Sequence, residues 1–267
     1  MKRLTLIIGL VCSGLVVLAA LVSLFWTPFD HTKVSSNRYG APGWPHILGT
    51  DALGMDTASR LMVGAQTTIV VGILAVAIAA AIGVPLGVFV GMGHKTLGEV
   101  LARGSDILYA LPALLLAILL AAALGASVTT ATIAIGVATI PIFQRMARAA
   151  TLTVMSQDYV LAAEVCGTPR FVIAFRHVLP NIAPLLGVQA AASFSMAILA
   201  EAGLAYLGLS APKTVPTWGR MLKDANFLTH PIQAVIPGMA IAIAVMGFNL
   251  VGDGVRDYLD PRLREVR

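Results

Sequence analysis

Six long apolar stretches constrain this chain more than any other feature of its sequence. A helix needs about 20 residues to cross a hydrocarbon core about 30 Å thick. The stretches run approximately over Leu4–Trp26, Thr67–Met92, Ile107–Leu124, Val128–Phe143, Ile182–Ala200 and Ile232–Val251. The fourth is short and carries Pro141 near its end, so we expect it to continue past Arg145. The sequence therefore predicts an all-α protein with six membrane-spanning helices.

The composition points to lipid as the solvent of this chain. Of its 267 residues 58% are hydrophobic and 12% are charged, against about 25% charged in an average soluble domain. A globule cannot hide so much apolar surface, whereas a helix in lipid can be apolar all round. The net charge is +5, but the 18 Lys and Arg residues are scattered between apolar runs. That scatter argues against a nucleic-acid partner. The two cysteines show neither metal-ligand spacing nor a disulfide framework.

The first stretch follows Lys2 and Arg3, a pattern shared by signal peptides and membrane anchors. Its apolar core exceeds the about 7–15 residues of a signal peptide and no A-x-A site follows, so we expect an uncleaved anchor. With the N-terminus inside, twelve of the Lys and Arg residues fall on inner segments and six on outer ones. Because cytoplasmic loops are enriched in these residues, both termini should face the cytoplasm.

Residues 1–66 form the anchor and an external segment, and residues 67–267 form the membrane core. An inner connection at about residues 156–181 is too long to be a simple turn and has helix punctuation. Ser156 is a good N-cap, Asp158 lies in the first turn, and Gly167 and Pro169 end the segment. These signals predict a cytoplasmic helix of about ten residues.

One face of this predicted helix carries Tyr159, Ala162, Ala163 and Cys166, at positions i, i+3, i+4 and i+7. An aromatic residue among small ones suits insertion into a groove on another protein. A surface helix resting on its own bundle explains the same pattern. Periodicity does not separate the two interpretations.

The chain lacks the motifs of an enzyme. The nearest approach to a phosphate-binding G-x-x-x-x-G-K-[ST] loop is Gly91-Met-Gly93-His94-Lys95-Thr96, where His94 separates glycine from lysine and no strand precedes. The five histidines are dispersed among loops on both sides of the membrane. No H-E-x-x-H or G-x-S-x-G occurs. We therefore expect no catalytic, cofactor or metal site in this chain.

Polar side chains at membrane depth are candidates for function by default. Glu201 lies near the outer end of the fifth stretch, where a structural carboxylate bonded to backbone amides competes with a role in solute binding. Gln189 and Asn249 lie deeper, and they either line a solute path or form hydrogen bonds across helices.

The inner connection resembles the EAA loop of the membrane subunits of binding-protein-dependent ABC importers. The likeness rests on Tyr159-Val-Leu-Ala162-Ala163-Glu-Val-Cys-Gly167 and on Arg176-His177-Val178-Leu179-Pro180-Asn181. The usual glutamate of the motif is replaced by Leu161, which removes one possible salt bridge. The resemblance implies that Asp158, Tyr159, Leu161, Ala162, Ala163, Glu164, Gly167 and Pro180 contact an ATPase.

Three further stretches resemble the dipeptide, oligopeptide and nickel permeases, and the C-type subunit is the closer fit. They are His46-Ile-Leu-Gly49-Thr50-Asp51-Ala-Leu-Gly54-Met-Asp56, then Ile198-Leu-Ala-Glu201-Ala-Gly203-Leu-Ala-Tyr206 with Pro216-Thr-Trp218-Gly219, and Phe248-Asn249-Leu-Val-Gly252-Asp253-Gly254 with the residues that follow. The resemblance implies the type I ABC importer permease fold with a cytoplasmic coupling helix. It also implies a B-type permease partner, two ATP-binding subunits that hold ATP and Mg, and an extracytoplasmic solute-binding protein.

Peptide is the first expectation for the solute, with nickel chelates, haem and glutathione as alternatives within the family. An ion-coupled secondary transporter is the rival from another class, and it would need a mid-membrane relay and paired broken helices. A membrane scaffold or assembly factor is a third hypothesis. The candidate carboxylates lie near helix ends, which favours the importer.

Overall fold

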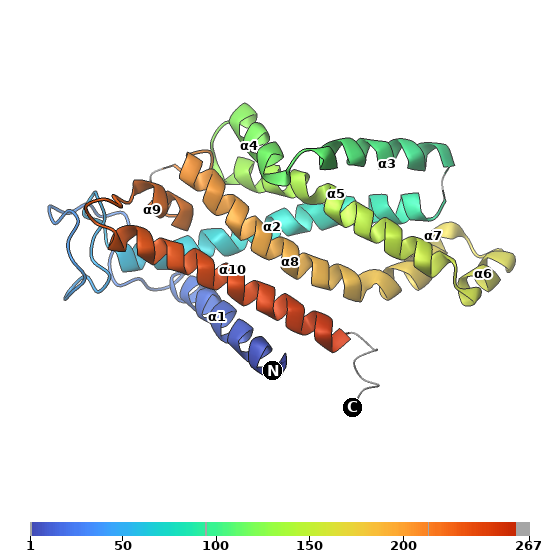
Figure 1. Cartoon of the computed structure of the whole chain (residues 1–267), viewed down its shortest axis with the longest axis horizontal. Coiled ribbons are helices and arrows are strands. Elements are labelled where there is room, and N and C mark those ends of the chain that lie inside the picture. Colours follow the sequence, from blue (N-terminus) through green and yellow to red (C-terminus); the bar gives the residue numbers. More distant parts are fainter. Residues whose placement is uncertain (1, 94, 213, 260–267) are drawn as a thin grey trace.

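The computed structural model describes residues 2–93, 95–212 and 214–259, and these form an elongated helical bundle (Figure 1). The described residues contain no β-strand. In chain order the helices are α1 (Lys2–Val22), α2 (Thr57–Gly91), α3 (Lys95–Ala110), α4 (Ala113–Leu124), α5 (Val128–Met155), α6 (Asp158–Val165), α7 (Arg170–Ile173), the π-helical turn η1 (Ala174–Val178), α8 (Leu179–Leu207), α9 (Trp218–Asp224) and α10 (Ile232–Leu259).

The predicted membrane spans are confirmed, although their boundaries differ. Five of the described helices are long and apolar enough to cross a membrane, and a sixth span is formed if α3 and α4 are taken together. These two helices are bent by 89° at Leu111 and Pro112. The expected third span is therefore not one straight helix, because the residue before a proline disfavours the α conformation and Pro112 has no N–H to continue the ladder.

The expected start of the second span at Thr67 was wrong, since α2 begins at Thr57. The Asp56 carboxylate caps the helix by accepting the Ser59 N–H at 2.7 Å, and His46 Nδ1 lies 2.9 Å from the other carboxylate oxygen. Asp56 is 2% exposed. This cap lets α2 extend beyond its apolar part toward the end of the bundle opposite α6 (Figure 1).

The most extensive contact between two of the described helices joins α2 to α5. Gly83, Gly87 and Gly91 recur every four residues and lie along one face of α2. A Cβ atom at Gly83 would lie 2.7 Å from the Ile140 carbonyl oxygen, and one at Gly91 would lie 2.6 Å from Thr151 Cβ. Small residues at this spacing allow two helix backbones to approach closely in a membrane. The α2–α5 contact therefore depends on glycine at these three positions, because any larger residue would hold the two helices apart.

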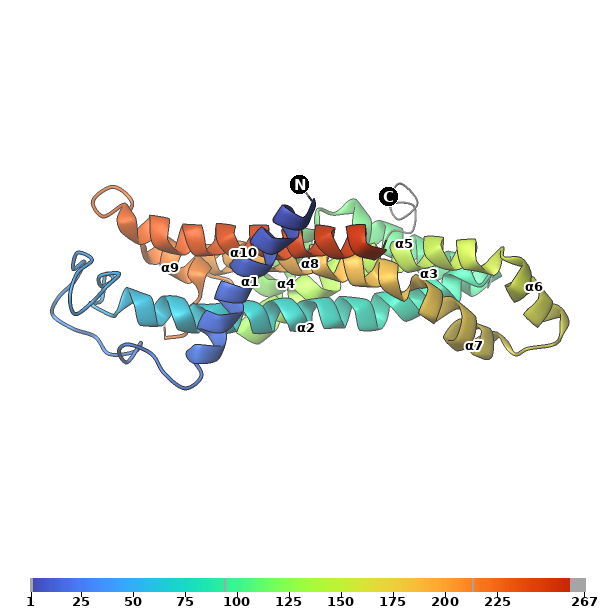
Figure 2. The same cartoon turned by 90° about the horizontal axis from the view of Figure 1, so that it is seen from below.

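Helices α1 and α10 lie against each other and run in opposite directions, and α1 crosses α10 at an angle (Figures 1 and 2). A Cβ atom at Gly9 would meet Leu250, and one at Gly247 would meet Cys12 and Ser13. Gly254 lies against Leu6 near the opposite ends of the two helices. The beginning of α1 and the end of α10 therefore lie beside each other.

We expect Gly87→Ala to destabilise the protein by about 1–3 kcal/mol, the usual cost of overpacking. The new Cβ would lie 2.7 Å from Ala147 Cβ and 2.9 Å from the Arg148 nitrogen, and it would meet the Gln144 carbonyl. Gly187→Ala on α8 is the matched control, because nothing lies within 4 Å of a Cβ there. Thermal unfolding in detergent should show a lower Tm for Gly87→Ala alone. Equal Tm values for the two variants would contradict the close α2–α5 contact.

Candidate functional site

Helix α6 projects from one end of the bundle, beyond the ends of α2 and α5 (Figures 1 and 2). It ends where Gly167 adopts a φ of +78°, and the Thr168 N–H donates to the Ala163 carbonyl at 3.0 Å. This left-handed termination is the stop that the sequence predicted. The helix has eight residues, slightly shorter than expected.

The N-cap expected at Ser156 was wrong. Ser156 ends α5, and its hydroxyl donates to the Thr153 carbonyl at 2.9 Å. Gln157 occupies the N-cap position of α6 and makes no capping hydrogen bond through its side chain. Because α5 continues to Met155, Ser156 serves the end of that helix and is unavailable to the next one.

The exposed residues of α6 form a surface that its own bundle does not cover. Val160 is fully buried in the core formed with α2, α5 and α8, and it anchors the helix. Leu161 is 46% exposed and Val165 is 89% exposed. Asp158, Ala162, Glu164 and Gly167 are also exposed, Ala163 is half-buried, and Pro180 is exposed in the first turn of α8. Sequence periodicity missed Val165 because it lies off the face that carries Tyr159.

Tyr159 combines the two interpretations that its sequence pattern allowed. Its ring is 47% exposed, and yet its hydroxyl accepts a hydrogen bond from Asn181 Nδ2 at 3.2 Å. The His177 ring centroid lies 5.8 Å from that of Tyr159. The side chain therefore connects α6 to the segment that continues into α8, and part of it remains open to a partner.

The segment after α6 runs directly into a membrane span. Helix α7, the turn η1 and α8 form a single 38-residue helical run over Arg170–Leu207. A π-helical turn often marks a functional position in a helix. Helix α6 and the helical run that contains α8 are thus joined by only four residues of irregular chain, 166 to 169.

Gln189 and Asn249, which are 60 positions apart in the sequence, line one pocket of about 240 Å³. Met146 of α5, Asp253 and Arg256 of α10 also line it. Gln189 reaches a second, apolar pocket of about 180 Å³ between α4, α5 and α8. Its Nε2 donates to Ser193 Oγ on its own helix at 3.0 Å. The two predicted polar residues therefore face common open space between α5, α8 and α10.

Glu201 lies apart from these two residues, in a buried cluster in the C-terminal part of α8. Its side chain is 1% exposed, and the Ser210 hydroxyl lies 3.4 Å from Oε1. The partner is a hydroxyl and not the backbone amides that the sequence suggested. The second carboxylate oxygen has no hydrogen-bond partner among the described residues.

Trp218 makes contacts beside this cluster that the sequence pattern does not predict. Trp218 Nε1 donates to the Leu61 carbonyl at 2.9 Å, and the indole lies against Gly64 of α2. Gly219 packs directly on the Ala202 backbone of α8. These contacts connect α2, α8 and α9 at the end of the bundle opposite α6 (Figure 1). They join segments far apart in the chain, so no local pattern indicated them.

Residues 83–265 match the model of a protein family described as "Binding-protein-dependent transport system inner membrane component". The chain belongs to this family. As such an inner membrane component it is a multi-pass membrane protein of an ABC transport system, as the sequence predicted.

Similar proteins match this inner membrane component along nearly its whole length. It is 37% identical to the dipeptide transport system permease protein DppC of Alkalihalophilus pseudofirmus, covering 97% of this chain and 86% of the relative. It is 38% identical to the di/tripeptide permease DppC of Pseudomonas aeruginosa, with 97% and 88% covered. The glutathione permease GsiD of Pectobacterium atrosepticum is 34% identical, with 95% and 87% covered.

The solved inward-facing MetNI methionine ABC transporter has a similar fold. It aligns with a TM-score of 0.56 and 16% identity, over 73% of this chain and 96% of that one. This likeness confirms the expected type I ABC importer permease fold for the inner membrane component.

We expect Asn249→Cys to react with a membrane-impermeant maleimide at least about tenfold faster than Ala244→Cys, since thiol reaction requires access. Both residues are on α10, but Asn249 lines the 240 Å³ pocket and Ala244 is fully buried. The native cysteines, Cys12 and Cys166, are first replaced by serine, because Cys166 is exposed. Labelling rates are measured on the solubilised protein by mass spectrometry. Equally slow labelling of both variants would show that the pocket is closed to water.

Proposed function

We propose that this inner membrane component is the permease subunit of an ATP-driven importer of peptides. The supporting observation is its similarity, at 37% and 38% identity over 97% of the chain, to permeases named for dipeptides and for di- and tripeptides. In this proposal a B-type permease pairs with the chain, the solute path runs between the two subunits, and the chain itself makes and breaks no covalent bond.

The energy source in this proposal lies in two ATP-binding subunits, which hold ATP and Mg. They dock on α6, where Asp158, Tyr159, Leu161, Ala162, Ala163, Glu164 and Gly167, together with Pro180, form the contact. The support is that Val160 fixes α6 to the core while most of its other side chains stay uncovered. Closure of the ATPase dimer moves α6, and the membrane helices rock between inward-facing and outward-facing states.

The path in this proposal passes Gln189 and Asn249, because both line the pocket between α5, α8 and α10. Gln189 also lines the pocket between α4, α5 and α8. Glu201 stabilises the outer end of α8, since it is buried with Ser210 and lines neither of the pockets around Gln189. A solute-binding protein docks on the outer segments, and both termini face the cytoplasm. Peptide amides and termini are polar, which suits amide side chains that can donate and accept hydrogen bonds.

The bent pair α3–α4 does not favour an ion-coupled secondary transporter. Such transporters carry broken helices in corresponding positions of two repeats. Among the described residues one bent pair occurs, and no counterpart in a second half accompanies it.

The proposal is tested by uptake into proteoliposomes that hold this chain, its co-purified permease partner and ATPases, with the binding protein outside. We expect labelled dipeptide to accumulate only with ATP and Mg inside. Unlabelled dipeptide should compete, and glutathione should not. Accumulation without an ATPase would contradict an ABC importer, and competition by glutathione alone would replace peptide with glutathione as the solute.

We expect Ala162→Asp with Ala163→Asp to leave membrane insertion intact and to reduce co-purification of the ATPase at least about tenfold. Two buried, unpaired carboxylates in a protein contact oppose docking strongly. Ala149→Asp, at an exposed position on α5 outside α6, is the control for added charge at the same end. Normal assembly and transport by the double variant would show that α6 does not dock the ATPase.

A further inference from the structure

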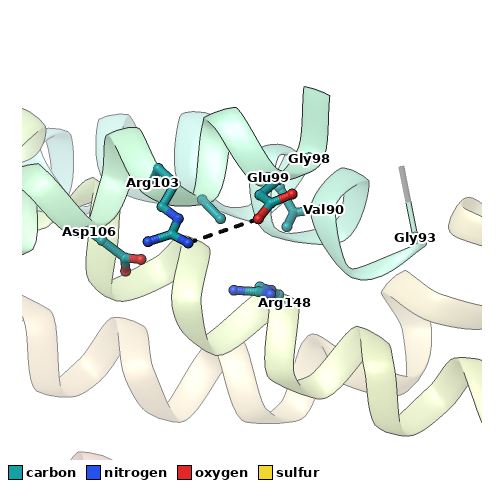
Figure 3. Close-up of a pocket in the computed structure, with 8 residues that line it drawn as sticks. Val90, Gly93, Gly98, Glu99, Arg103, Asp106 and Arg148 are labelled. Carbon is teal, nitrogen blue, oxygen red and sulfur yellow. Dashed lines mark ion pairs between the residues drawn. The ribbon is translucent and has the colours of Figure 1, made fainter. Parts of the chain in front are cut away.

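A polar pocket of about 440 Å³ opens between the end of α2 and the facing parts of α3 and α5. It is separate from the pockets around Gln189 and from the exposed surface of α6. Val90 and Gly93 come from the end of α2, Glu99, Arg103 and Asp106 come from α3, and Arg148 comes from α5. Figure 3 shows the guanidinium groups of Arg103 and Arg148 turned toward the same space.

The charges around this pocket leave a positive surplus. Asp106 is paired outside the pocket with Arg145 at 3.1 Å, and that guanidinium also lies 3.8 Å from the centroid of the Tyr109 ring. Glu99 lies 4.0 Å from Arg103 in an exposed pair (Figure 3), which is a weak interaction. Arg148 has no acidic side chain within ion-pair distance among the residues that the structure describes. Within the described part of the chain Arg148 is therefore unpaired and Arg103 is only weakly paired, so both guanidinium groups are available to an anion.

The pocket lies at the end of the long uncharged run of α2. Helix α2 carries no charged residue from Leu61 to Gly93, so the apolar span ends where the pocket begins. On α5 the buried Phe143 is followed within five positions by Arg145 and Arg148. Basic pockets between membrane helices on the inner side bind the headgroups of anionic lipids.

The surface beside the pocket is suited to an acyl chain. Val100 is 63% exposed and Ile107 is 72% exposed on α3. They lie one position after Glu99 and Asp106, so they lie on the helix face next to the one that lines the pocket. An anion with an apolar tail would thus meet charge and apolar surface on adjacent faces of one helix.

We propose that this pocket binds the phosphodiester headgroup of an anionic phospholipid between Arg103 and Arg148, with its acyl chain along Val100 and Ile107. Arginine forms paired hydrogen bonds to phosphate oxygens. Arg103 exchanges its weak contact with Glu99 for the phosphate. The site is independent of the solute that the importer carries.

The test measures lipid binding by the purified full chain in a neutral detergent, by native mass spectrometry with phosphatidylglycerol or phosphatidylcholine. We expect wild-type protein to retain phosphatidylglycerol in preference to phosphatidylcholine. Arg148→Gln should weaken phosphatidylglycerol binding about fivefold, the effect of removing one positive charge near the membrane surface. Arg148→Lys should retain most of the binding.

Arg176→Gln is the matched control, because it removes an exposed charge from η1 outside the pocket. It should bind phosphatidylglycerol as the wild type does. Equal binding of both lipids by wild type, or equal phosphatidylglycerol binding by Arg148→Gln and Arg176→Gln, would overturn the proposal. If Arg148→Gln unfolds thermally as the wild type does, its loss of phosphatidylglycerol binding is due to the site and not to misfolding.

A second arm separates a lipid headgroup from free phosphate. Inorganic phosphate in excess should not displace phosphatidylglycerol, because it lacks the chain contacts. If inorganic phosphate displaced phosphatidylglycerol from the wild type, and Arg148→Gln abolished the binding of both, the pocket would bind a soluble anion. That result would overturn the lipid site.

Discussion

The close approach of α2 and α5 is the contact on which the other parts of the bundle depend. Lipid tails are as apolar as leucine, so helices in a membrane associate by packing and not by hiding from water. Glycines along one face of α2 bring α5 near enough for extensive contact. Other glycines on α2 receive Phe194 of α8 and Trp218 of α9. Helix α2 thus positions three elements that carry the candidate path and the outer end.

Much of the fold could be predicted from the sequence because the length of an apolar stretch is a local property. The exceptions have physical reasons in neighbouring residues. The Asp56 cap extends α2 into polar sequence, and Pro112 divides an otherwise apolar span at a sharp bend. Ser156 has the chemistry of an N-cap, but it ends the preceding helix α5 and is not available to α6. In each case two local signals competed, and the sequence alone did not rank them.

The candidate site could be predicted only in part. The inner helix and its glycine stop follow from adjacent residues, whereas the joint pocket of Gln189 and Asn249 requires α8 and α10 to be neighbours. Apolar periodicity does not state which helices pack together. The same limit explains why Arg103 and Arg148, from different helices, were missed as a pair. Glu201 shows the converse, since its depth was predicted and its hydroxyl partner was not.

The continuous helical run from Arg170 to Leu207 connects the end of the bundle that carries α6 to the opposite end (Figure 1). Its 38 residues correspond to about 57 Å at about 1.5 Å per residue, nearly twice a hydrocarbon core of about 30 Å. In the proposed importer a run of this length would act as a lever arm, since a tilt of about 5° would displace one tip by about 5 Å relative to the other. The buried Ser210 and Trp218 contacts sit at the far tip. In the proposed importer, a small movement of α6 would thereby displace the opposite tip of this helical run.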